Sequence, residues 1–176
     1  MYLLDANVFI TAKNFYYGTD FAPGFWEWIA AEYTANDLRS IPAVRDELLA
    51  QDDELTAWAR RMPSDFWRQE VDADIPSLRT IAAWTMTGDP RFLQQARTDF
   101  LATADYRLVA QAHAGAHVVV THEVPQPEGK KKIKIPDVCA AFAISRREPF
   151  GLFRELGLQL VRPAVASARA DSTLIE

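Results

Sequence analysis

The sequence lacks the features that would place it among disulfide-rich or membrane-spanning proteins. Its 176 residues include a single cysteine, Cys139, so no disulfide can form within the chain. A lone cysteine fits a reducing compartment, and we expect a cytoplasmic protein. No apolar run approaches the length that spans a bilayer, and MYLLDANVFI has no basic residue ahead of its apolar ones. We therefore expect neither a membrane partner nor a signal peptide.

Positive charge is also scarce. The chain has 19 Lys and Arg against 24 Asp and Glu, for a formal net charge of -5. A general cationic coat for nucleic acid is therefore excluded. A polyanionic substrate would have to meet a local basic patch or a bound metal ion.

The length suits one domain with a sizeable core, and we find no internal repeat or low-complexity segment. We assign this domain to residues 1–166 and expect 167–176 to be a flexible tail. The densest break is VPQPEGKKKIK, residues 124–134, where two prolines, a glycine and a lysine run cluster. That composition predicts an exposed loop or hairpin within the domain rather than a linker.

Short apolar segments alternate with helical patterns along the chain. We expect strands at 2–5, 38–41, 117–121 and 158–161, and helices at 23–33, 42–50, 54–62, 75–86, 90–97, 102–114 and 135–144. Strands separated by helices predict an α/β fold with a mainly parallel sheet. Ligands of such sheets bind outside the carboxyl ends of the strands.

Asp5 lies at the carboxyl end of the first expected strand, between Leu3, Leu4 and Val8. An unpaired carboxylate is costly to bury in such surroundings, so its presence calls for a reason. Glu123 follows the strand VVV with only Thr121 and His122 between. If the two strands are parallel, Asp5 and Glu123 emerge at one edge of the sheet. The alternative for Glu123 is an ordinary loop acid.

Three further acids lie on expected helices. Glu47 flanks the apolar face of PAVRDELLA, Asp105 lies on the apolar stripe of ADYRLVAQAHA, and Asp137 falls in the first turn of IPDVCAAFAI. Acids near helix N-termini are favoured by the helix dipole, so each also has a purely structural explanation.

Carboxylates that converge on one edge repel one another. Two charges 4 Å apart repel by about 4 kcal/mol at an effective dielectric constant near 20. A cluster of this kind protonates, separates or binds a cation. Oxygen ligands alone suit Mg²⁺ or Mn²⁺ better than zinc.

These acids, in this order, resemble the PIN-domain nucleases. The resemblance rests on LLDAN, on the acid in DEL about forty residues later, on ADYRLVAQA and on VVVTHE, and it spans nearly the whole chain. MYLLDANVFI, VVVTHE and IKIPDVC look most like an uncharacterised PIN-like subgroup akin to the VapC toxins. The resemblance implies a three-layer α/β/α sandwich around a short, mainly parallel sheet.

Carried over by position, Asp5, Glu47 and Asp105 match the three core acids of that family. The family often has Thr-x-Asp after its late strand, whereas this chain has Thr121-His122-Glu123, so Glu123 and Asp137 compete for the fourth place. All five acids are candidate metal and catalytic residues. Asn7 and Thr121 are expected to donate hydrogen bonds to the carboxylates or to metal-bound water.

The implied activity is Mg²⁺- or Mn²⁺-dependent hydrolysis of RNA phosphodiester bonds, as the toxin of a type II toxin–antitoxin pair. The expected partners are an RNA substrate, an antitoxin protein and a second copy in a homodimer, for which FWEWI, residues 25–29, is a candidate face. The lysines of GKKKIKIP are candidate RNA contacts, or alternatively a solvated turn: Lys130, Lys131, Lys132 and Lys134.

Two other functions stay open. A haloacid-dehalogenase-like phosphatase also has an Asp at the end of its first strand, although its second Asp is replaced here by Asn7. Such an enzyme would form a covalent phosphoaspartate instead of activating water. A catalytically inactive PIN-like module that binds RNA or protein is the other alternative.

Overall fold

A four-stranded sheet of short parallel strands lies at the centre of the protein. The computed structural model describes residues 1–50 and 52–161, so the expected tail at 167–176 lies outside the described residues. The strands run in the order β2-β1-β3-β4 and are all parallel: β1 (Tyr2–Leu4), β2 (Leu38–Arg39), β3 (Val118–Val120) and β4 (Arg146–Arg147). Leu4 pairs with Val120, so β1 and β3 end in register at the same edge.

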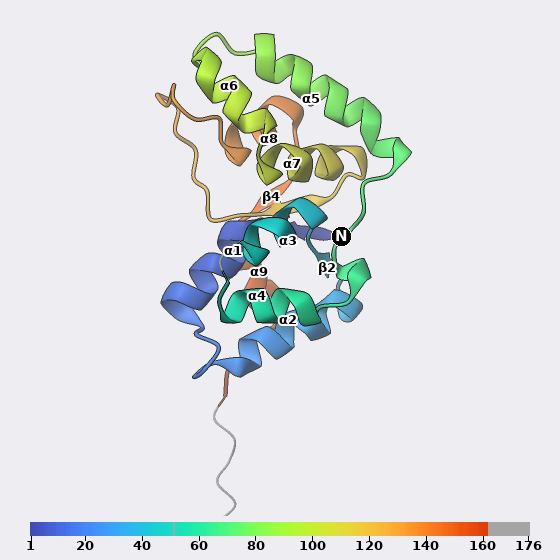
Figure 1. Ribbon diagram of the computed structural model, residues 1–176, viewed down its shortest axis with the longest axis vertical. Helices are drawn as coiled ribbons and strands as arrows, with labels where there is room; N and C mark the ends of the chain where they lie inside the picture. The colour runs from blue at the N-terminus through green and yellow to red at the C-terminus, as the bar shows by residue number, and fades with distance from the viewer. Residues whose placement is uncertain (51, 162–176) are drawn as a thin grey trace, which may run out of the picture.

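Helices cover both faces of this sheet. They are α1 (Ala6–Thr11), α2 (Pro23–Ala35), α3 (Pro42–Leu49), α4 (Glu54–Arg61), α5 (Ile75–Thr87), α6 (Gln94–Leu101), α7 (Ala104–Ala114), α8 (Ile135–Phe142) and α9 (Pro149–Glu155). Short helical turns lie at Ala12–Tyr16, Ser64–Phe66 and Asp72–Asp74. Helices α5 to α8 lie on one side of the sheet, and α1, α2, α4 and α9 on the other (Figure 1). The predicted three-layer α/β/α architecture is confirmed.

Proline sets the start of several helices. Pro23, Pro42 and Pro136 each occupy the first turn of a helix, where the missing amide hydrogen costs nothing. The helix expected to begin at Pro90 begins at Gln94 instead. Asp89 accepts a hydrogen bond from the Arg91 amide at 2.9 Å, which holds that proline in a turn.

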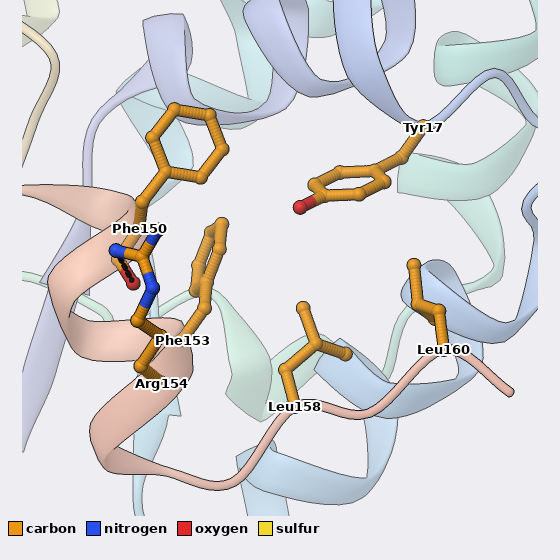
Figure 2. A pocket seen from close by; sticks show the side chains of 6 residues that line it. All are labelled: Tyr17, Phe150, Phe153, Arg154, Leu158 and Leu160. Carbon is orange, nitrogen blue, oxygen red and sulfur yellow. Dashed lines mark hydrogen bonds between the residues drawn. The ribbon is translucent and has the colours of Figure 1, made fainter.

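The fourth strand was misplaced by the sequence patterns. Residues 158–161 form no strand, and the sheet is completed by Arg146–Arg147, a two-residue segment without apolar side chains. Leu158 and Leu160 instead line a cavity of about 250 Å³ with Tyr17 and residues of α9 (Figure 2). The apolar side chains of Leu158 and Leu160 thus pack against helices, and their backbone does not pair with a strand.

The core on the α1–α4 side is rich in aromatic residues. The Phe9 ring lies 5.2 Å from Trp58, and Phe66 lies 4.8 Å from Trp67, measured between ring centroids. Within FWEWI, Phe25, Trp26 and Ile29 are buried in this core: their exposed fractions are 0%, 5% and 0%. Those three side chains are therefore unavailable as a homodimer face. In the described ranges, no helix combines the length and apolar character needed to cross a membrane.

Candidate functional site

Asp5 ends β1 and is almost fully buried. Its side chain is only 3% exposed, and its amide donates a hydrogen bond to the carbonyl of Val120 at 3.0 Å. The same register brings Thr121, the residue after β3, beside it. The Thr121 hydroxyl donates to Asp5 Oδ2 at 2.7 Å. Two residues 116 positions apart in sequence are thus joined at the carboxyl edge of the sheet.

Thr121 also accepts two hydrogen bonds. Asn7 Nδ2 donates to its hydroxyl oxygen at 3.1 Å, and the Glu123 amide donates to the same atom at 3.0 Å. Asn7 Oδ1 accepts from the His122 amide at 3.1 Å. Asn7 therefore fixes the turn after β3 and orients Thr121, while its side chain makes no direct bond to the Asp5 carboxylate in the described structure.

Asp105 occupies the first turn of α7, and its charge acts on Asp5. Burial is the main cause that raises the pKa of Asp5 from its ordinary value of 3.8 to about 8, and the charges of Asp105 and Glu123 add to the rise. Hydrogen bonds from the Thr121 hydroxyl and from the Asn7 backbone amide oppose it. Burial also raises the pKa of Asp105 to about 6, with Glu123 and Glu47 adding to the effect. These four carboxylates, Asp5, Glu47, Asp105 and Glu123, are called the acidic cluster below.

Glu123 follows β3 and lies mostly inside the protein, since its side chain is 12% exposed. Its Oε2 accepts a hydrogen bond from the Ile135 amide at 2.8 Å. That amide belongs to the first residue of α8, where the helix has no partner of its own for its amide hydrogens. The N-terminus of α8 thus holds the carboxylate of Glu123 in the cluster.

Glu47 is the exposed member of the acidic cluster. It extends from α3, and its Oε1 accepts a hydrogen bond from the Ala104 amide at 3.4 Å, next to Asp105. The bond joins α3 to α7 through two residues that are 57 positions apart along the chain. Glu47 therefore reaches the N-terminus of α7 from the solvent side.

Asp137 lies elsewhere. Its Oδ2 accepts from the Lys134 amide at 2.9 Å, and its Oδ1 lies 3.0 Å from Arg91 Nη2. Its charge is not among those that raise the pKa of Asp5 or Asp105. Of the two rivals for the fourth acid, the structure groups Glu123 with the cluster and gives Asp137 a helix-capping role.

Of the four candidate lysines, Lys132 is the one that contacts the cluster. Its Nζ lies 3.3 Å from Glu123 Oε1. Burial tends to lower the pKa of Lys132, but Glu123, Asp105 and Asp5 outweigh it and raise the pKa. Lys131 and Lys132 also line a cavity of about 270 Å³ together with Asp105 and Phe100. The sequence offered the lysines as RNA contacts and did not indicate this pairing.

The donor set suits a hard divalent cation. All four members of the cluster are carboxylates, which are ligands that such cations prefer. The charges of Asp105 and Glu123 raise the pKa of Asp5, and those of Glu123 and Glu47 raise the pKa of Asp105. Among residues 1–50 and 52–161, no group of three His, Cys, Asp or Glu side chains is arranged to hold a metal ion. Three of the carboxylates are held by protein donors: Thr121, the Ile135 amide and the Ala104 amide. The oxygen-only chemistry of these donors is the kind that a hard cation such as Mg²⁺ or Mn²⁺ prefers.

Comparison with known protein families identifies the family of this chain. The model of a family described as a domain of unknown function, DUF4411, matches residues 2–160. Searches of the curated proteins and of the solved structures found no match to the chain. The resemblance to the PIN-domain nucleases stays a prediction. Because the match covers nearly the whole chain, the protein belongs to the DUF4411 family.

Proposed function

We propose that this protein is a metal-dependent endoribonuclease whose Mg²⁺ or Mn²⁺ site is the acidic cluster. The observation that carries the proposal is the meeting of carboxylates from β1, α3, α7 and the turn after β3 at the carboxyl edge of a parallel sheet. This edge is where α/β folds bind their ligands. Keeping several mutually repelling carboxylates there costs stability, which favours a function that needs them.

Each member of the cluster has a distinct part. Asp5 and Asp105, the two carboxyls whose pKa is raised, would hold the ion together with Glu123 and Glu47. Thr121 orients Asp5, and Asn7 orients Thr121. A bound divalent ion supplies a lowered pKa for a water molecule and offsets negative charge on the phosphate.

RNA is proposed as the substrate on the strength of the PIN-domain resemblance. The same resemblance supports a toxin role with an antitoxin partner and a homodimer. The single cysteine, Cys139, supports a cytoplasmic location. The lysines beside the cluster support a polyanionic substrate, because Lys131 and Lys132 line the cavity next to Asp105. An antitoxin would act by blocking access to this edge of the sheet.

The test compares wild type with Asp5→Asn, Asp105→Asn and a control, Asp99→Asn. Asp99 is an exposed acid of α6 that lines the same cavity as Asp105 and lies outside the cluster. With 5′-labelled RNA and Mn²⁺, we expect wild type and Asp99→Asn to cleave, and the two cluster variants to lose at least about 100-fold in rate, a loss of roughly 2.7 kcal/mol in transition-state stabilisation. EDTA should stop cleavage.

The outcomes separate the alternatives. Equal cleavage by all four proteins would refute the assignment of the cluster. Hydrolysis of a phosphomonoester through a phosphoaspartate at Asp5, detected by mass spectrometry of a trapped intermediate, would support the phosphatase instead. RNA binding by wild type without cleavage in Mn²⁺ or Mg²⁺ would support the inactive module.

A further inference from the structure

Lys132 reaches the acidic cluster from outside. Its Nζ lies 3.3 Å from Glu123 Oε1, yet its side chain is 63% exposed, whereas that of Glu123 is 12% exposed. The ammonium thus sits at the boundary between the cluster and solvent. It carries the positive charge that three neighbouring carboxylates attract, those of Glu123, Asp105 and Asp5.

The backbone that carries Lys132 is anchored on both sides. Ile133 and Ile135 are buried in the core, with exposed fractions of 1% and 0%. On the other side, the Leu93 amide donates to the Lys130 carbonyl at 3.0 Å. The segment therefore holds the Lys132 backbone in place while its side chain extends over the cluster and can leave it by rotation of its own bonds.

We propose that Lys132 is the internal cation of the acidic cluster and that a divalent ion displaces its ammonium. This inference rests on the metal site of the proposed function. A divalent ion among the carboxylates and an ammonium on Glu123 repel each other, so the two occupy the cluster alternately. Release of the ammonium costs little, because the Lys132 side chain is 63% exposed and water can solvate it once it leaves Glu123. The released side chain stays beside the cavity that it already lines with Lys131 and Asp105.

The exchange predicts that removing the lysine strengthens metal binding. We would titrate Mn²⁺ into metal-free wild type, Lys132→Met, Lys132→Arg and Lys131→Met by isothermal calorimetry at about pH 8. Lys131 is an exposed neighbour that lines the same cavity and, in the described part of the chain, forms no salt bridge within 4.0 Å. Circular dichroism in EDTA would verify that each variant is folded.

We expect Lys132→Met to bind Mn²⁺ about fivefold more tightly than wild type, because the metal no longer has to break the ion pair between Lys132 and Glu123. Lys132→Arg, which keeps the charge, and Lys131→Met should stay within about twofold of wild type. This result would support the exchange by a measurement that needs no substrate.

Two results would overturn the proposed exchange, and only the second would also overturn the metal site. If wild type binds Mn²⁺ and Lys132→Met binds it with the same or lower affinity, the exchange is refuted while the metal site stands. If none of the four proteins binds Mn²⁺, or Mg²⁺ in a second titration, the proposed function is refuted together with the exchange.

Discussion

Asp5→Asn should make the metal-free protein less sensitive to rising pH. In the folded protein the pKa of Asp5 is raised from 3.8 to about 8, mainly by burial and then by the charge of Asp105. Between these two values the folded chain keeps a proton that the unfolded chain has lost. A group of this kind lowers stability as pH rises, and the loss is complete above the folded pKa.

The size of the effect follows from the linkage relation. One proton retained only in the folded state makes the free energy of unfolding fall by about 1.4 kcal/mol for each pH unit. From about pH 5 to about pH 7, Asp5 alone therefore removes about 3 kcal/mol. Asparagine has the same shape, and its amide oxygen can still accept the hydrogen bond from Thr121. The variant should escape this loss and become more stable than wild type near neutral pH.

The assay is urea unfolding in EDTA, followed by tryptophan fluorescence, at about pH 5, 6, 7 and 8. Asp99→Asn is the control, because it removes an exposed acid and should run parallel to wild type. We expect the wild-type and Asp5→Asn curves to diverge by about 3 kcal/mol between pH 5 and pH 7. Parallel curves would show that Asp5 ionises normally in the folded protein, and the electrostatic description of the cluster would be wrong.

Three further predictions test other parts of the site. Thr121→Val should lower the free energy of unfolding by about 2 kcal/mol in chemical denaturation, since Asp5, Asn7 and the Glu123 amide lose their shared partner, whereas Thr121→Ser should cost less. Mn²⁺ affinity measured by calorimetry should rise from about pH 6 to about pH 8 as the two carboxyls with raised pKa lose their protons, and a flat profile would contradict this. Asp137→Asn should cost about 1 kcal/mol of stability in a thermal melt but leave Mn²⁺ affinity unchanged, because its carboxylate caps α8 and pairs with Arg91. Glu123→Gln should instead weaken Mn²⁺ binding. The reverse result would make Asp137 the fourth ligand.

Much of the fold was predictable because its strongest signals are local. Proline at the first turn and apolar periodicity located α2, α3 and α8, and the run VVV located β3. The fourth strand was not predictable in this way. Arg146–Arg147 owes its conformation to hydrogen bonds with its neighbour, such as that from the Thr121 amide to the Arg147 carbonyl at 3.2 Å, and no side-chain pattern marks it.

The site was predictable as a set of acids and not as an electrostatic arrangement. Strand ends indicated Asp5 and Glu123, because parallel strands finish at one edge. The choice between Glu123 and Asp137 needed the contacts of both, since each lies near the start of α8 and either satisfies the spacing. The contact between Lys132 and Glu123 depends on the path of the loop at 124–134, and composition alone does not determine that path.

The charge of the acidic cluster is balanced in competing ways, and metal affinity depends on all of them. Protons on Asp5 and Asp105 neutralise the buried part of the cluster, and the Lys132 ammonium offsets charge at its exposed boundary. A divalent ion has to replace the protons on Asp5 and Asp105 as well as the Lys132 ammonium. Its affinity therefore measures the difference between one doubly charged cation and the protons and ammonium that it displaces, and not the number of carboxylates alone. Since protons leave as pH rises and the ammonium stays, Lys132 becomes the main competitor of the metal above about pH 8.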